Sequence, residues 1–268
     1  MKTAFRERLI YLLARTSDWL LVRLVGKIAS AWIKGMANYS YNINLNGEMR
    51  ALKILGRHGM ATIFDVGANV GEWSELAASA NPGASVHGFE LAPATYEMLD
   101  KRVGGHPQIT AQPFGLSDRE GVTDFFFFPD HEVHSSMVAL VDYEHRLEQG
   151  QTRRGEDYCR DQGIERVDFL KIDVEGVEHL VLKGFEDMLK NGRIRVIQFE
   201  YGPPNLSSGF MLRDFHALLE PFGFRIGKIY PHTVKFKAYA PADDNFMGGN
   251  FLAVQATDSE LMQELRNR

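Results

Sequence analysis

After residue 45, short apolar runs alternate with amphipathic stretches along the chain. This alternation predicts a mainly parallel β-sheet with helices on both faces, because each amphipathic helix must bury one face against a sheet. The expected strands cover residues 61–66, 85–90, 109–116, 122–128, 166–173, 194–200, 224–229 and 251–255. The expected helices cover residues 70–80, 93–103, 176–190 and 212–221. Four consecutive phenylalanines favour a strand at 122–128 that is buried on both faces.

The composition of the chain excludes some classes of function. A chain of 268 residues has room for one α/β domain with a sizeable core. Its formal net charge of −5 argues against a nucleic-acid binder, which usually carries a strongly basic face. The single cysteine, Cys159, excludes an intramolecular disulfide and fits the reducing cytoplasm. We therefore expect a cytoplasmic protein without a nucleic-acid partner.

Residues 1–36 differ in charge from the rest of the chain. Seven basic and two acidic side chains give this segment a formal net charge of +5, which leaves −10 for the remainder. On a helix, Arg23, Lys27 and Lys34 lie on one side. The opposite side carries large apolar residues, namely Leu21, Val25, Ile28 and Trp32. Residues 16–18 resemble a break followed by a new N-cap, so two helices are expected.

Two interpretations of this basic segment compete. In the first, the helices form a cap that packs on the domain or on a second subunit of a homodimer. In the second, they bind the inner face of the membrane peripherally, because basic amphipathic helices with tryptophan suit anionic lipid surfaces. No apolar run approaches the roughly 18–20 residues that a bilayer-spanning helix needs. The expected division of the chain is a helical extension at 1–45 and a catalytic domain at 46–268.

The turn after the first expected strand is the strongest local signal of a cofactor. In parallel sheets ligands bind beyond the carboxyl ends of the strands. Gly67 permits a tight turn there, and Gly71 permits the following helix to pack closely against the strand. Glu90 ends the second strand, 23 residues after Gly67, where a carboxylate can accept hydrogen bonds from the two ribose hydroxyls of a nucleoside.

The residues within this turn favour an adenosylated amino acid over a dinucleotide. A dinucleotide fingerprint is G-x-G-x-x-G, whose second glycine makes room for the pyrophosphate. Here Ala68 and Asn69 occupy those positions. Asp65 precedes the turn, and its carboxylate would repel a pyrophosphate but attract the ammonium of a methionine moiety. An NAD-linked oxidoreductase is therefore disfavoured.

Over residues 40–255 the chain resembles the FkbM family of methyltransferases. The matching blocks are Asn46-Gly47-Glu48, residues 65–74, Phe89-Glu90, residues 115–118 and residues 168–184. The resemblance implies a Rossmann-like class I methyltransferase fold with a mostly parallel seven-stranded sheet. It also implies methyl transfer from S-adenosylmethionine, usually to hydroxyl groups of sugars, polyketides or related metabolites. Leu91 departs from the family, which often has proline after Phe-Glu.

The expected cofactor site follows from the turn and from this resemblance. The methionine end and the turn around it would use Asp65, Gly67, Ala68, Asn69, Gly71, Trp73, Ser74 and Asp173. The ribose and adenine would contact Glu90, Leu91, Leu116 and Ser117. The alternative is that the glycines serve ordinary turns, that the Glu90 carboxylate is solvated and that Ser117-Asp118 caps a turn.

The candidate catalytic groups follow the later strands. Lys171, Asp173 and Glu175 alternate with apolar residues and would share one strand face. Asp173 is the first candidate to orient an acceptor hydroxyl or to take its proton; the further candidates are Glu200, His179 and His134. In the alternative interpretation Glu178 caps a helix, His179 is a surface residue and Lys171 only neutralises Asp173. No spacing is diagnostic of metal ligands, so no obligatory metal is expected.

The sequence therefore predicts an O-methyltransferase that acts on a sugar, glycan, glycolipid or polyketide-like metabolite. Methylation of nitrogen or carbon is an alternative, although the Asn/Asp-Pro-Pro-Tyr block typical of amino-group methylation is absent after the fourth strand. A non-enzymatic cofactor-binding protein is another. Residues 129–154 and 202–210 are expected to form a lid or substrate loops on the acceptor side.

Overall fold

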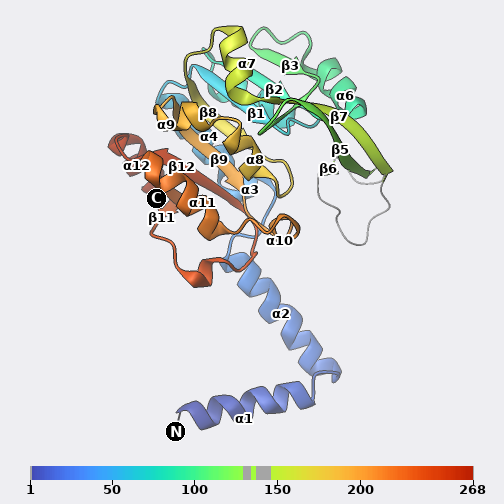
Figure 1. Ribbon diagram of the computed structural model, residues 1–268. Helices are drawn as coiled ribbons and strands as arrows, with labels where there is room; N and C mark the ends of the chain where they lie inside the picture. The colour runs from blue at the N-terminus through green and yellow to red at the C-terminus, as the bar shows by residue number, and fades with distance from the viewer. Residues whose placement is uncertain (1, 129–133, 137–145, 268) are drawn as a thin grey trace.

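The centre of the protein is an eight-stranded sheet in the order β11-β10-β12-β9-β8-β1-β2-β3 (Figure 1). The computed structural model describes residues 2–128, 134–136 and 146–267. The strands are β1 (Thr62–Val66), β2 (Ser85–Phe89), β3 (Ile109–Gln112), β8 (Val167–Ile172), β9 (Ile194–Glu200), β10 (Phe224–Tyr230), β11 (Thr233–Phe236) and β12 (Asn250–Gln255). The five strands from β3 to β9 run parallel, and the other three pair antiparallel. The predicted α/β fold with a mostly parallel sheet is confirmed.

The described sheet has one strand more than the seven expected. The additional strand is β11, which follows β10 after a tight turn and pairs with it at the edge, with Tyr230 opposite Thr233. A short edge strand of this kind gives a weak sequence signal, because only Val234 of its four residues is fully buried.

Helices cover both faces of this sheet. They are α3 (Ile43–Asn46), α4 (Glu48–Arg57), α5 (Glu72–Ala80), α6 (Pro93–Val103), α7 (Gly155–Gln162), α8 (Glu178–Lys183), α9 (Glu186–Lys190), α10 (Asn205–Ser208), α11 (Leu212–Leu219) and α12 (Ser259–Arg266), with short 3-10 helices η1 (Glu220–Phe222) and η2 (Pro241–Asp243). Successive residues of a strand point to opposite faces. Ile63 accordingly packs into the core under α4, α5 and α12, while Phe64 packs into the core under α7, α8, α9 and α11. The strands are buried on both sides, so they form near-continuous apolar runs.

A second, four-stranded sheet lies beside the first, in the order β4-β7-β5-β6 (Figure 1). Its strands are β4 (Gly115–Ser117), β5 (Gly121–Phe128), β6 (His134–Ser136) and β7 (Arg146–Arg154). The prediction of one strand over 109–116 is therefore wrong, because the chain leaves the main sheet after β3 and enters the small sheet at β4. β5 is also not buried on both faces: Phe125 and Phe128 are buried, whereas Val122 is 59% exposed.

The predicted lid or loop at 129–154 is partly a strand. Residues 146–154 form β7, which pairs with β5 along most of its length. Residues 129–133 and 137–145 lie outside the described residues. The polar composition of β7 hid its strand character, because this strand belongs to a sheet that is only half buried.

The helix predicted over 176–190 is two short helices, α8 and α9. They meet at Gly184, where a Cβ atom would lie 2.1 Å from the carbonyl oxygen of Ser117. The close approach of β4 thus requires glycine at this position and interrupts the helix. β8 also ends earlier than expected, at Ile172, so Asp173 and Glu175 lie in the turn that follows.

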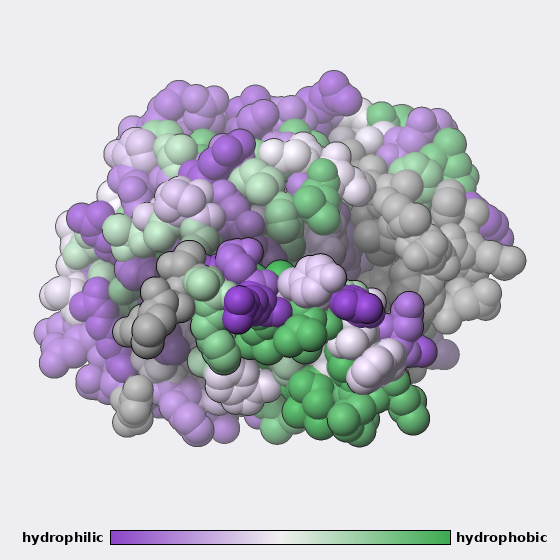
Figure 2. Space-filling model, turned by 90° about the horizontal axis from the view of Figure 1, so that it is seen from below, coloured by the Kyte–Doolittle hydropathy of each residue, from purple (hydrophilic) through white to green (hydrophobic). Residues whose placement is uncertain are grey.

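The N-terminal segment forms α1 (Lys2–Arg15) and α2 (Leu20–Met36), which project away from the sheets (Figures 1 and 2). The break predicted at 16–18 is confirmed, although Trp19 rather than one of these residues holds the N-cap position of α2. No helix in the described ranges is both long and apolar enough to span a membrane. The expected division after residue 45 falls within α3 and stays a prediction.

Candidate active site

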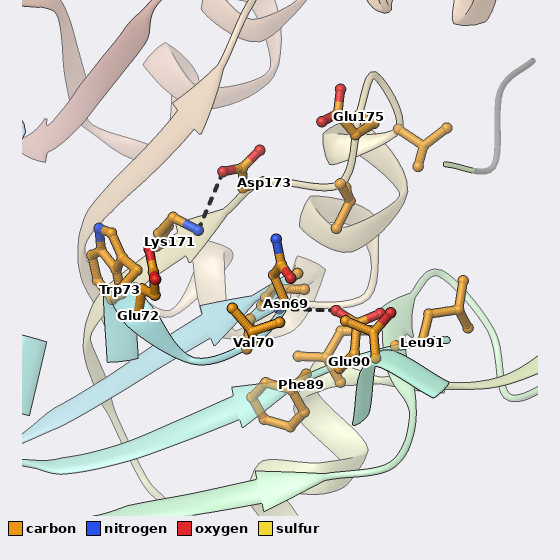
Figure 3. Close-up of a pocket in the computed structure, with 18 of the residues that line it drawn as sticks. Asn69, Val70, Glu72, Trp73, Phe89, Glu90, Leu91, Lys171, Asp173 and Glu175 are labelled. Atoms are coloured by element: carbon orange, nitrogen blue, oxygen red, sulfur yellow. Dashed lines mark hydrogen bonds and ion pairs between the residues drawn. The ribbon is translucent and has the colours of Figure 1, made fainter. Parts of the chain in front are cut away.

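A cavity of about 850 Å³ lies where β1, β2 and β8 end. It is lined by the turns after these strands, the segment that joins α2 to α4, the small sheet, and residues of α4, α5, α6 and α8. Figure 3 shows the side chains from the strand ends that face one another across this cavity. Of the residues predicted to bind the cofactor, those that line the cavity are Gly67, Ala68, Asn69, Trp73, Glu90, Leu91, Leu116, Ser117 and Asp173.

The turn after β1 is held between two neighbouring strands. The backbone N–H groups of Gly67 and Ala68 both donate to the carbonyl oxygen of Phe89, at 3.0 and 2.9 Å. Gly67 has φ +78°, and a Cβ atom on it would lie 1.9 Å from the carbonyl oxygen of Asp173. Asn69 also adopts a left-handed conformation, with φ 53°. Only glycine at position 67 lets the turn approach both strands.

Glu90 is fixed by the same turn. Its Oε2 accepts a 2.9 Å hydrogen bond from the backbone N–H of Asn69, and its Oε1 accepts one of 2.9 Å from Ala92. The side chain is buried and lines the cavity (Figure 3). A carboxylate offers about four acceptor positions, so this orientation suits additional donors such as hydroxyl groups. The position predicted for Glu90 at the end of the second strand is thus confirmed.

Two polar atoms in the cavity wall have no partner within the described part of the chain. They are Oδ1 of Asn69 and Nε1 of Trp73, both inaccessible to solvent. Buried polar atoms are nearly always hydrogen-bonded, since leaving one unpaired costs about 1–3 kcal/mol. A bound molecule would satisfy this pair only if both side chains turn toward the cavity.

Asp65 lies behind the cavity wall. It is fully buried; its Oδ1 is 3.0 Å from Nζ of Lys171, and its Oδ2 accepts a 2.7 Å hydrogen bond from Ser74. Neither Asp65 nor Ser74 lines the cavity, so the structure gives no support to the predicted contact of Asp65 with a methionine ammonium. Burial lowers the pKa of Lys171, but the charges of Asp65 and Asp173 outweigh it and keep that pKa above its ordinary value. Asp65 instead holds a buried cation.

Asp173 faces the cavity from the turn after β8. Its side chain is 36% exposed, and its Oδ2 lies 3.3 Å from Nζ of Lys171. Burial, together with the charges of Asp173 and Glu175, raises the pKa of Glu200 well above its ordinary value. Glu200 does not line the cavity, so the structure does not bring this predicted catalytic residue to the cavity wall.

One predicted histidine, His179, is not brought to this site. The ring of His179 stacks on Phe210 with centroids 4.5 Å apart and does not line the cavity. Burial lowers its pKa. His134 lies in β6, where its backbone pairs with Phe128, and its side chain is outside the described residues. Gly71, at the start of α5, packs against Leu99 of α6 and not against a strand, and it does not line the cavity.

Glu178, the first residue of α8, binds the turn before the helix and does not cap the helix as the alternative interpretation had it. Its Oε1 accepts hydrogen bonds from the backbone N–H groups of Gly176 at 3.0 Å and Val174 at 3.4 Å. Burial raises its pKa to about 7. Among the described residues, no group of three or more histidine, cysteine or acidic side chains is arranged to hold a metal ion.

Glu48 and Tyr41 are cavity residues that were absent from the expected site. Glu48 is buried and accepts hydrogen bonds from Gln198 at 2.6 Å, from Asn250 at 2.8 Å and from Asn46 at 2.5 Å. Burial raises the pKa of Tyr41, and the negative charge of Glu200 raises it further. The one signal for Glu48 in the sequence was its block Asn46-Gly47-Glu48; no local pattern shows that this block folds back onto β9 and β12.

Ser117 shows how the small sheet contributes to the site. It was expected at the end of a third strand of the main sheet but lies in β4. Phe127 and Phe128 of β5 and Thr152 of β7 line the same cavity. The small sheet therefore forms the wall opposite the strand ends of the main sheet.

Known proteins resemble this chain in sequence. The family model described as the methyltransferase FkbM domain matches residues 65–226. Methyltransferase sdnD of Sordaria araneosa is 30% identical over 197 residues, which cover 61% of this chain and 73% of that protein. The 31-O-demethyl-FK506 methyltransferase FkbM of Streptomyces tacrolimicus is 30% identical over 170 residues, which cover 49% of this chain and 64% of that one.

Among solved structures, the crystal structure of methyltransferase FkbM from Methylobacillus flagellatus KT matches with a TM-score of 0.44 and 15% identity. The match covers 73% of this chain and 43% of that one, so the chain spans less than half of that protein. The family model matches more than half of this chain and includes the turn after β1, the end of β2 and the β8–β9 region. The chain therefore belongs to the FkbM family of methyltransferases.

Proposed function

We propose that the protein transfers a methyl group from S-adenosylmethionine to a hydroxyl group of a polyhydroxylated small molecule or glycan. One observation carries this proposal. Glu90 and Asp173 face the same cavity from different strand ends (Figure 3). This arrangement offers acceptors for hydroxyl groups on one side and for a cationic group on the other.

The residues of the cavity fit such a cofactor. Glu90 would accept hydrogen bonds from the two ribose hydroxyls, and the amide oxygen of Asn69, once its side chain turns toward the cavity, would accept one from the methionine ammonium. Leu116 and Ser117 would lie beside the adenine. The carboxylates of Glu90, Asp173 and Glu175 favour a cationic ligand over a pyrophosphate, because like charges repel strongly in a partly enclosed site. When bound, the cofactor supplies a methyl group activated by its positive sulfur.

Asp173 is placed to act on the acceptor. Lys171 holds its carboxylate through an ion pair of 3.3 Å, which orients it in the cavity. In the proposed reaction the acceptor oxygen forms its bond to the methyl carbon, the bond from sulfur to that carbon breaks, and the hydroxyl proton passes to Asp173. An alcohol loses this proton late, so a well-placed carboxylate suffices as the base.

The hydroxyl acceptor has support from a relative. The Streptomyces protein is named for methylation of an oxygen, at the 31-position of a demethylated FK506. The resemblance noted in the sequence likewise implies hydroxyl groups of sugars, polyketides or related metabolites. We extend the same kind of acceptor atom to this chain.

Calorimetric titration tests the cofactor assignment. We expect S-adenosylhomocysteine to bind the full chain and NADH not to bind. Glu90→Gln should weaken S-adenosylhomocysteine binding about tenfold or more, since hydrogen bonds to a charged group contribute about 1.5–3 kcal/mol. Glu97→Gln, an exposed change on α6, serves as the control and should leave binding unchanged. Binding of NADH in place of S-adenosylhomocysteine would contradict the assignment.

The acceptor atom needs a second experiment. Labelled S-adenosylmethionine and a panel of sugars and hydroxylated polyketides should give a product whose label lies on oxygen. Label found only on nitrogen or carbon would contradict the proposed acceptor. Binding of the cofactor without transfer to any member of a broad panel would favour the non-enzymatic alternative.

A further inference from the structure

The apolar side chains of α1 and α2 have no partner among the described residues. None of the residues of α2 is buried. Its large apolar side chains are as exposed as those of an isolated helix, at 83% for Leu20, 70% for Leu21 and 66% for Trp32. Phe5 on α1 is 72% exposed. The cap interpretation, in which these helices pack on the domain of the same chain, therefore does not describe this structure.

The charges of α2 form a narrow stripe, whereas those of α1 are spread around the helix. On α2, Arg23, Lys27 and Lys34 lie on one side, and apolar side chains cover more than half of the circumference. On α1, Phe5, Leu9 and Leu12 recur at helical spacing. Seen from below, α1 lies nearest the viewer and shows green apolar side chains beside purple basic ones (Figure 2).

This distribution fits an anionic lipid surface better than a second protein chain. A two-helix interface buries a narrow seam, whereas the apolar side of α2 is broad. An interfacial helix inserts such a broad side among the lipid chains while lysine and arginine reach the headgroups. Trp19 and Trp32, both 66% exposed, are of the residue type enriched at membrane interfaces. The net charge of +5 in residues 1–36 adds electrostatic attraction.

We propose that α1 and α2 form an interfacial segment that docks the protein on a bilayer containing anionic lipids. The end of this segment is fixed to the body: Nδ2 of Asn38 donates to the carbonyl oxygens of Asn46 at 2.7 Å and Ile229 at 2.9 Å. Three residues later, Tyr41 lines the cavity. Docking of α2 therefore holds the cavity close to the lipid surface.

Vesicle sedimentation with the full chain tests the proposal. We expect binding to vesicles of phosphatidylcholine with about one third phosphatidylglycerol, and much weaker binding to phosphatidylcholine alone. Replacing Arg23, Lys27 and Lys34 together by glutamine should lower the partition coefficient about a hundredfold, since each cation near an anionic surface contributes about fivefold. The matched control replaces Lys53, Lys101 and Arg225, exposed cations of the body, by glutamine and should bind as the natural chain does.

Tryptophan fluorescence gives a second readout. Trp19 and Trp32 are exposed, whereas the third tryptophan, Trp73, is 9% exposed. Anionic vesicles should shift the emission to shorter wavelength, and Trp19→Phe with Trp32→Phe should remove the shift while S-adenosylhomocysteine binding persists. Equal binding of the charge variant and the natural chain would overturn the proposal. So would a stable dimer that Leu21→Ser with Trp32→Ser converts to monomer in sedimentation, without any vesicle binding by the natural chain.

Discussion

Nζ of Lys171 lies 3.0 Å from Oδ1 of Asp65 and 3.3 Å from Oδ2 of Asp173. One buried cation thus joins the strand before the cofactor turn to the carboxylate that faces the cavity. Lys171 also lies over the ring of Trp73, with 5.2 Å between Nζ and the ring centroid. The arrangement positions Asp173 through a group that itself has little contact with solvent.

Lys171→Met should destabilise the protein by about 3–5 kcal/mol, because it leaves the buried carboxylate of Asp65 without its partner. Lys190→Met is the control, since Lys190 forms an exposed ion pair with Glu186 at 2.7 Å; it should cost less than about 1 kcal/mol. Urea denaturation measures both. A loss below about 1 kcal/mol for Lys171→Met would show that Asp65 is not charged in the folded protein.

Gly67→Ala should prevent the turn after β1 from closing. The change meets both an unfavourable φ of +78° and a contact of 1.9 Å with the carbonyl oxygen of Asp173. Gly59→Ala meets only the unfavourable φ, +69°, with no atom within 4 Å, and should cost about 1–2 kcal/mol. Thermal unfolding and S-adenosylhomocysteine titration should show a larger loss at position 67 in both stability and affinity. Equal losses would mean that the turn is free to move away from Asp173.

Asp173→Asn should lower kcat by about a hundredfold or more, the usual contribution of a positioned general base. Affinity for S-adenosylhomocysteine should change by less than about fivefold, because the asparagine retains an acceptor oxygen. Asp100→Asn, an exposed change on α6, provides the control. Single-turnover kinetics separates the two quantities. A large loss of affinity with kcat unchanged would assign Asp173 to the methionine ammonium instead.

The pKa of Glu178, raised to about 7 by burial, predicts a pH dependence of stability. An unfolded glutamate titrates near its ordinary pKa of about 4.3. Between these values the folded chain binds a proton that the unfolded chain has released, so stability falls as pH rises through this window. Glu178→Gln stays neutral throughout. It should therefore gain about 2 kcal/mol relative to the natural chain on going from pH 5 to pH 8.

Urea denaturation at the two pH values checks this prediction. Glu97→Gln, which alters an exposed glutamate, should show no such gain. If Glu178→Gln and the natural chain follow parallel curves, Glu178 is ionised in the folded protein across the whole range.

Local patterns predicted most of the main sheet. The strands at β1, β2, β8 and β9 were found because burial on both faces makes each one a continuous apolar run. The helix α6 was found over residues 93–103, where Pro93 fits the first helical position. The glycine turn and Glu90 were likewise found, because a turn that approaches a ligand needs residues of a particular kind at fixed spacing.

The small sheet was the part of the fold that sequence patterns predicted least well. β7 is polar and β4 has only three residues, so neither shows a periodic signal. Both are strands because their backbones pair with segments distant in sequence. β4 pairs with β7, with Gly115 opposite Thr152, and β7 pairs on its other edge with β5, with Gly121 opposite the same Thr152. Such pairing depends on how the rest of the fold brings the segments together.

The sequence by itself determined the α/β architecture, the cofactor turn from Gly67 to Gly71 and the acidic end of β2, because these features depend on neighbouring residues and on short periodic spacing. Only the tertiary structure decided what each charged group contacts. In the folded protein Asp65 lies behind the cavity wall, and Glu48 lines the cavity although it precedes the first strand. His179 does not line the cavity that Glu90 and Asp173 face. A carboxylate has the same local signature whether it holds a buried lysine or faces a ligand, and long-range packing selects between the two.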